Sequence, residues 1–114
     1  MANGTREVAV TWTFGKTGGA GLNTASTGAG TSYNTFNLGE TFTFFVQSDA
    51  AATCSYQIRS GLQQAGPFAV LSSGTLSTSG LDLVQLPGPL GWLSPRIKSL
   101  NSTANTITIR AEAL

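Results

Sequence analysis

The chain of 114 residues contains no histidine, and this absence removes more chemistry than any other feature of its composition. Histidine is the usual general base near neutral pH, the commonest metal ligand and the partner that activates serine and cysteine nucleophiles. Neither a calcium-loop pattern nor a Cys/His cluster is present. The composition therefore argues against a hydrolytic enzyme, and we expect a protein that has no catalytic residues and needs no metal or cofactor.

Charge is also scarce, at 10% of the chain with a net charge of +1. The basic residues are scattered along the sequence at Arg6, Lys16, Arg59, Arg96, Lys98 and Arg110. Such scattering predicts no basic stripe for a phosphate backbone, so we expect no nucleic-acid partner. The carboxylates are equally far apart, at Glu7, Glu40, Asp49, Asp82 and Glu112. We expect them to be solvated at strand ends and turns rather than paired as in a glycosidase.

The chain has one cysteine and no long apolar run, which argues against a disulfide-bonded secreted protein and against a membrane-spanning one. Cys54 has no partner for an internal disulfide, and its alternating neighbours predict a buried thiol that packs as a small hydrophobe. No apolar run approaches the about 20 residues that span a bilayer. The first seven residues lack the pattern of a signal peptide. We expect synthesis in a cytoplasm and no membrane partner.

The chain does contain many glycines, serines and threonines, together with short alternating apolar runs. Residues 6–14 place Val8, Val10, Trp12 and Phe14 on one face, and residues 40–47 place Phe42, Phe44 and Val46 inward and Phe45 outward. Further short runs follow at 54–59, 68–72, 74–79, 81–86, 96–100 and 105–113. Their spacing predicts one all-β domain over 1–114. We expect an antiparallel β-sandwich of seven to eight strands, jelly-roll-like or immunoglobulin-like, with a small barrel as the alternative.

Residues 15–39 interrupt this pattern. The segment is rich in Gly, Thr, Ala and Ser, and its isolated apolar side chains are Leu22, Tyr33, Phe36 and Leu38. Loops of this length are uncommon inside a compact domain and are usually functional or disordered. The segment is either a flexible surface loop or an extended arm that orders on a partner, and we favour the arm. Deletion of residues 20–32 should then leave a folded domain that no longer binds.

Aromatic residues suggest a different function, carbohydrate binding, because an aromatic ring can stack on the face of a sugar. Trp92 lies in the Pro/Gly-rich stretch 86–95 and is the best candidate for an exposed aromatic side chain. Packing in a core or a protein interface competes with this interpretation. A carbohydrate site therefore remains the alternative to a protein-binding surface.

Five short motifs follow one another in the second half of the chain. They are G-P-F-A-V-L at 66–71, a polar strand at 77–79, W-L-S-P-R-I at 92–97, a Ser/Thr/Asn turn at 101–105 and T-I-T-I at 106–109. In this combination the chain resembles small β-sandwich virion proteins of tailed bacteriophages over about half of its length. It departs from their common form at 60–66, where an S-x-D-G-x-x-W turn is missing.

Within that group, a short chain with a long uncharged segment looks most like a capsid decoration (cement) protein. The resemblance implies a structural protein of the virion's outer surface that binds the major capsid protein and itself, as a homodimer or homotrimer. It implies contact residues on the segment and the Pro/Gly stretch: Leu22, Tyr33, Phe36 and Trp92. The alternative is a host-recognition or carbohydrate-binding module of a tail or head fibre.

Overall fold

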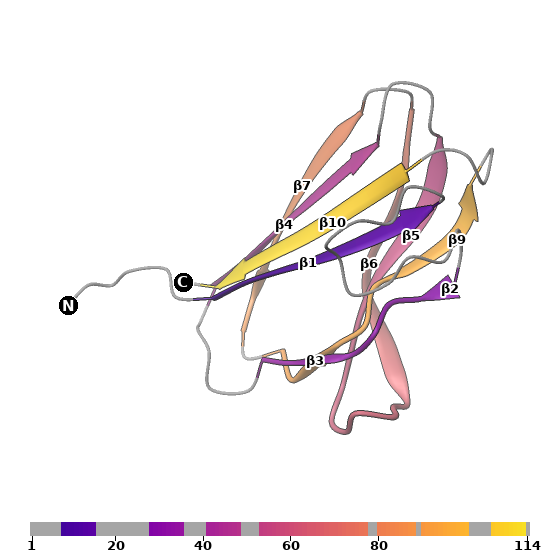
Figure 1. The fold of residues 1–114 in the computed structure, drawn as a ribbon. Helices are drawn as coiled ribbons and strands as arrows, with labels where there is room; N and C mark the ends of the chain where they lie inside the picture. Colours follow the sequence, from indigo (N-terminus) through magenta and orange to yellow (C-terminus); the bar gives the residue numbers. More distant parts are fainter. Residues whose placement is uncertain are drawn as a thin grey trace.

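The computed structural model describes residues 8–15, 28–35, 41–48, 53–77, 80–88, 90–100 and 106–113, and every regular element among them is a β-strand (Figure 1). The strands are β1 (Val8–Gly15), β2 (Gly28–Ala29), β3 (Tyr33–Asn34), β4 (Thr41–Ser48), β5 (Cys54–Gly61), β6 (Phe68–Leu76), β7 (Leu81–Pro87), β8 (Trp92–Leu93), β9 (Arg96–Leu100) and β10 (Thr106–Ala113). The predicted all-β class is confirmed. Over these residues, no helix is long and apolar enough to cross a membrane.

The first sheet, sheet A, has the order β1-β10-β4-β7, and all its neighbouring strands are antiparallel. Its three ladders run without a register shift. β10 lies between β1 and β4. Its pairing with β1 places Val8, near the start of the chain, beside Ala113, near its end. β1 and β7 are the two edge strands of sheet A.

Sheet B is built around β5, which pairs with β6 on one side and with both β8 and β9 on the other. β2 pairs with β9 and β3 pairs with β8, so two interrupted strands run beside each other. With β2/β3 and β8/β9 each counted as one interrupted strand, the described residues form two sheets of four strand positions each. A register shift between Ile58 and Arg59 leaves Leu71 of β6 without a partner in β5.

One hydrophobic core lies between the two sheets. Sheet A contributes Val10, Trp12, Phe14, Phe42, Phe44 and Val46, which were predicted to face inward, together with Ile107 and Ile109, all buried; the side chain of Val8 is outside the described part. Sheet B contributes Cys54, Tyr56, Ile58, Leu93 and Ile97. The period of two in the sequence therefore predicted the buried faces of β1, β4 and β5.

Part of the predicted arm is instead built into the body. Residues 28–35, which we call the strip, lie along sheet B as β2 and β3, and the remaining residues 16–27 and 36–39 are outside the described part. Trp12 Nε1 donates a hydrogen bond of 2.7 Å to the Thr31 carbonyl, and Gly30 N donates one of 2.6 Å to the Pro95 carbonyl. The strip therefore closes the side of the body where β1 ends sheet A.

The close approach of the strip to Trp12 requires a glycine. A Cβ placed on Gly30 would lie 2.6 Å from Trp12 Cδ1 and 3.2 Å from the Pro95 carbonyl oxygen. The deletion of residues 20–32 proposed from the sequence would remove Gly30 and Thr31. We now expect it to destabilise the domain, because the arm interpretation wrongly treated this part as separable.

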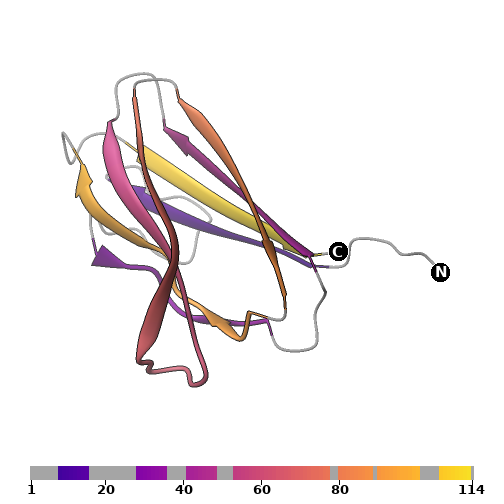
Figure 2. The ribbon, with the colours of Figure 1, turned by 180° about the vertical axis from the view of Figure 1, so that it is seen from behind.

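At the other end of sheet B the hairpin of β5 and β6 projects beyond the rest of the body, as seen from behind in Figure 2. β6 and β7 form the corresponding edges of the two sheets on the side away from the strip. The hairpin, β6 and β7 carry the exposed large hydrophobic side chains of the described residues.

Candidate functional site

Large hydrophobic side chains that are exposed in the described residues lie on the β5–β6 hairpin, on β6 and on β7. They are Leu62 (82% exposed) at the hairpin tip, Val70 (51%) and Leu71 (38%) on β6, and Leu81 (54%) and Leu83 (62%) on β7. Isolated exposed leucines are ordinary, but several of them on one hairpin and on two edge strands make these elements candidates for binding. The candidate site is therefore the β5–β6 hairpin together with the β6–β7 side.

The hairpin has a local geometry that its glycines make possible. Gly66 adopts a positive φ of 85° and its amide donates a 3.0 Å hydrogen bond to the Gln63 carbonyl, which closes the turn. A Cβ on Gly61 would collide with the Pro67 carbonyl oxygen. At the tip, Ser32 Oγ of the strip donates a 2.9 Å hydrogen bond to the Gln64 carbonyl. The strip thus supports the hairpin as well as Trp12.

Arg59 fixes the base of the hairpin. Its Nε donates to the Ser94 carbonyl at 2.9 Å, its Nη2 donates to Ser94 Oγ at 3.0 Å, and its guanidinium carbon lies 5.1 Å from the centre of the Phe68 ring. Burial, with a smaller contribution from nearby Arg96, lowers the pKa of Arg59, which still carries its charge at neutral pH. Ser94 Oγ in turn donates to the Gly30 carbonyl at 2.9 Å. The hairpin, β8 and the strip are therefore linked by one hydrogen-bonded chain.

A groove of about 480 Å³ opens between the hairpin and the segment before β8. It is lined by Ser60, Gly61, Leu62, Pro67, Phe68, Ala69, Leu90 and Gly91. None of these side chains is charged, so the groove suits an apolar segment rather than a phosphate or a carboxylate.

Next to the β6–β7 side, a side chain of β5 is hydrogen-bonded to a side chain of β7, which links the two sheets. Tyr56 Oη donates to Asp82 Oδ2 at 2.7 Å, and burial followed by this hydrogen bond raises the pKa of Tyr56. Gly74 makes room for the phenol, because a Cβ there would lie 2.7 Å from Tyr56 Oη. Asp82 was predicted to be a solvated carboxylate at a strand end or turn, but it is half-buried and accepts this hydrogen bond. It is the second residue of β7, and its face of the strand is turned toward the core.

Cys54 is buried at the start of β5, as predicted. Burial raises the pKa of its thiol to about 11, with a smaller opposing contribution from a hydrogen bond to the backbone of Leu76. The thiolate is the reactive form of cysteine, so this side chain is unreactive near neutral pH. Nothing in its surroundings assigns it to the candidate site.

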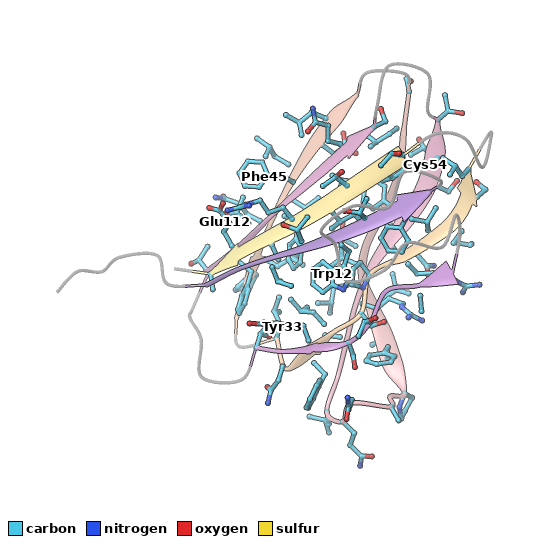
Figure 3. All side chains as sticks on the ribbon, viewed as in Figure 1. Trp12, Tyr33, Phe45, Cys54 and Glu112 are labelled. Atoms are coloured by element: carbon cyan, nitrogen blue, oxygen red, sulfur yellow. The ribbon has the colours of Figure 1, made fainter. Side chains whose placement is uncertain are left out.

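The outer faces of the two sheets differ in charge. Sheet B carries Arg59, Arg96 and Lys98, three of the six basic residues, which the sequence analysis had expected to stay scattered. The sequence did not reveal this group because β5 and β9 are neighbours only in the folded sheet. On sheet A, Arg110 and Glu112 form an exposed ion pair of 2.8 Å beside Phe45, as Figure 3 shows. Phe45 is half-buried on this outer face, where it was predicted.

Two of the four predicted contact residues lie outside the described part of the chain, namely Leu22 and Phe36. Tyr33 is half-buried in β3, opposite Leu93, and packs against the core (Figure 3). Trp92 is half-buried in β8 between Asn34 and Gly61. Trp92 therefore neighbours a groove residue without lining the groove. Sequence reasoning missed Leu62, Leu81 and Leu83, since alternation alone does not distinguish a solvated face from a binding face.

Among the described residues, no group of three or more metal-ligating side chains is close enough to hold a metal ion. No protein-family model matches the chain, and no curated protein sequence matches it. Its fold is similar to a crystal structure of PirA, with a TM-score of 0.50, 12% sequence identity and 92% of each chain covered. At this level of identity the similarity concerns the fold alone.

Proposed function

We propose that this chain is a structural binding protein that decorates the outer surface of a bacteriophage shell and attaches to the major capsid protein through the β5–β6 hairpin. The observation that carries the proposal is Leu62, the most exposed large hydrophobic side chain in the described residues, at the tip of the projecting hairpin and at the edge of an uncharged groove. The virion assignment itself comes from the resemblance of residues 66–109 to small phage virion proteins.

We further infer that the fold is a jelly roll. With β2/β3 and β8/β9 each counted as one interrupted strand, each sheet has four strands, and none of the sheet A neighbours is consecutive in the chain. Eight strands in two sheets with such crossovers are typical of jelly rolls, which occur in viral capsid proteins. The order supports this choice over an immunoglobulin-like sandwich, in which consecutive strands form hairpins more often.

A hairpin with a fixed base is suited to attachment. The two hydrogen bonds of Arg59 to Ser94 and its stacking on Phe68 hold the base, and Ser32 holds the tip through the Gln64 carbonyl. Binding then costs little conformational entropy, because the segment that enters the interface is already ordered. An apolar tip side chain beside an uncharged groove gives a contact that is insensitive to salt.

The test is co-sedimentation of the purified protein with shells that lack it, followed by electron microscopy of the particles. Leu62→Asp should weaken binding at least about tenfold, as loss of a central interface side chain usually does. Gln63→Asp adds the same charge at the neighbouring exposed position and should bind within about twofold of the wild type. Equal binding by Leu62→Asp and the wild type would refute attachment through the hairpin.

A carbohydrate-binding module of a fibre is the second candidate, and the groove is the observation that favours it. Phe68 lines the groove and is the aromatic side chain that a sugar would meet there. Arg59 already lies over this ring, which leaves less of it for stacking. A glycan array separates the two functions, since a shell-binding protein is silent on the array and binds shells.

A further inference from the structure

β6 and β7 leave an open side on the body. β6 ends sheet B, β7 ends sheet A, and the two strands run along the same side of the molecule, nearest the viewer in Figure 2. Four of the five exposed large hydrophobic side chains of the described residues belong to these two strands. An edge strand presents unpaired N–H and C=O groups, so an apolar edge is a template for another strand.

Proteins usually protect such edges by charge, proline, bulges or short length. β6 has a bulge at Leu71, which interrupts its regular geometry. β7 has seven residues in unbroken register with β4 and a proline only at its last position, Pro87. Its single charge, Asp82, accepts the hydrogen bond from Tyr56 and does not guard the edge. β7 is therefore the less protected of the two edges.

We propose that β7 pairs antiparallel with β7 of a second copy of this chain across a two-fold axis, which extends sheet A into a continuous sheet of eight strands. The outer face of the new ladder is formed from both copies by Leu81, Leu83 and Gln85, all exposed and uncharged in the single chain. The leucines of the two copies then cover each other.

Charge is compatible with a second copy and argues against a partner that binds through opposite charge. A two-fold contact places each surface against itself, so a charged surface repels its own copy. The exposed face of β7 carries no charge, whereas the outer face of sheet B carries Arg59, Arg96 and Lys98. A partner selected by charge would use sheet B, and a copy of this chain fits β7.

The area that the interface buries sets the affinity we expect for the dimer. A standard interface buries about 800 Å² on each partner, which is about one seventh of the 5710 Å² that this chain exposes. β7 is about 24 Å long, and its ladder with a few neighbouring side chains covers less than that standard area. We therefore expect a weak dimer with a dissociation constant on the order of 10 µM. The proposal goes beyond the function proposed above and does not depend on it, because pairing requires no shell.

The experiment is sedimentation equilibrium of the full chain from about 1 to about 300 µM. The wild type should pass from 11.7 kDa to twice that mass with rising concentration. Leu83→Lys should remain monomeric, because each lysine would face its own copy near the axis. Leu62→Lys is the matched control, since it makes the same substitution at a more exposed leucine away from β7, and it should dimerise as the wild type does.

Leu83→Gln, a milder change, should weaken dimerisation at least about tenfold, and circular dichroism of each variant checks that it is folded. The proposal is overturned by a wild type that stays monomeric throughout, by a Leu83→Lys variant that dimerises normally, or by equal loss in Leu62→Lys. A trimer also overturns it, because a three-fold ring cannot pair β7 with itself.

Discussion

The two sides of the molecule where the sheets end, the strip side and the β6–β7 side, differ in how they are covered. On one side, the strip of residues 28–35 runs beside sheet B and binds Trp12 of β1, so both sheets are joined there by a fully buried side chain. On the other side, Tyr56 of β5 donates a hydrogen bond to Asp82 of β7, and β6 and β7 expose four large hydrophobic residues among those described. The comparison teaches that the strip side belongs to the core, whereas the β6–β7 side is a surface available for contacts.

The largest effect is expected where the closed side is opened. Trp12→Ala removes a fully buried indole and its 2.7 Å hydrogen bond to the Thr31 carbonyl. We expect the free energy of unfolding to fall by about 3–5 kcal/mol, as for other buried tryptophans. Urea denaturation followed by circular dichroism measures this. A loss below about 1 kcal/mol would mean that the strip and Trp12 do not seal the core.

Gly30→Ala tests the same side from the strip. The added Cβ would lie 2.6 Å from Trp12 Cδ1, and both groups are held by backbone contacts. We expect a loss of about 1–3 kcal/mol in the free energy of unfolding, typical of overpacking. Gly28→Ala is the control for the loss of a glycine in the same strip, because a Cβ there meets nothing within 4 Å, although its positive φ of 109° adds some strain. Gly30→Ala should be the more destabilising of the two.

Tyr56→Phe tests the side-chain hydrogen bond between β5 and β7 next to the open side. The substitution removes the donor to Asp82 and leaves the buried ring in place, so we expect a loss of about 1–2 kcal/mol. If Asp82→Asn in the Tyr56→Phe background costs nothing further, the two side chains act as one pair. Full additivity of the two single substitutions would contradict the hydrogen bond as the link between the sheets.

A rise in pH above 9 should lower the free energy of unfolding through Cys54 and Tyr56, which both lie on β5. The folded-state pKa of Cys54, about 11, lies above its ordinary value of 9.0, so the unfolded chain loses this proton first. The contribution of Cys54 to stability is complete below pH 9 and is lost as pH rises toward 11. Tyr56, whose pKa is also raised, adds a further loss above pH 10. Urea denaturation at pH 8, 9.5 and 10.5 should show a steady fall, and Cys54→Ala should remove the part between pH 9 and 10.

The smallest effect on folding is expected on β7 itself. Leu83→Ser should change the free energy of unfolding of the monomer by no more than about 0.5 kcal/mol, because the side chain is 62% exposed. Denaturation at about 1 µM, below the expected dissociation constant, isolates this effect. A loss comparable to that of Trp12→Ala would mean that Leu83 is part of the core and that the two sides are alike.

The long strands were predictable from the sequence because one physical rule, the alternation of buried and exposed side chains, decides them. Trp12, Phe44 and Ile58 are buried where the pattern places them. The strip was not predictable in this way. Its strands are two residues long, and it is held by backbone hydrogen bonds of Gly30 and Thr31 that leave no pattern in the residue types.

The candidate site was predicted less well than the fold. Of the residues expected to make contacts, Tyr33 and Trp92 lie half-buried in β3 and β8, whereas the exposed leucines are elsewhere. Which face of an edge strand is left uncovered depends on the neighbours that the topology supplies. The same reason explains why the gathering of Arg59, Arg96 and Lys98 was missed: their proximity is a property of the sheet and not of the sequence spacing.

The central claim, that one side is closed and the other is a contact surface, is tested most directly by amide hydrogen exchange at two protein concentrations. At 1 µM, the amides of β1 that are hydrogen-bonded to β10 should be protected, and the outward amides of β7 (Leu81–Pro87) should exchange quickly. At 300 µM, β7 should become protected while β1 stays unchanged. Exchange in β7 that does not depend on concentration, or a change of equal size in β1, would contradict the account.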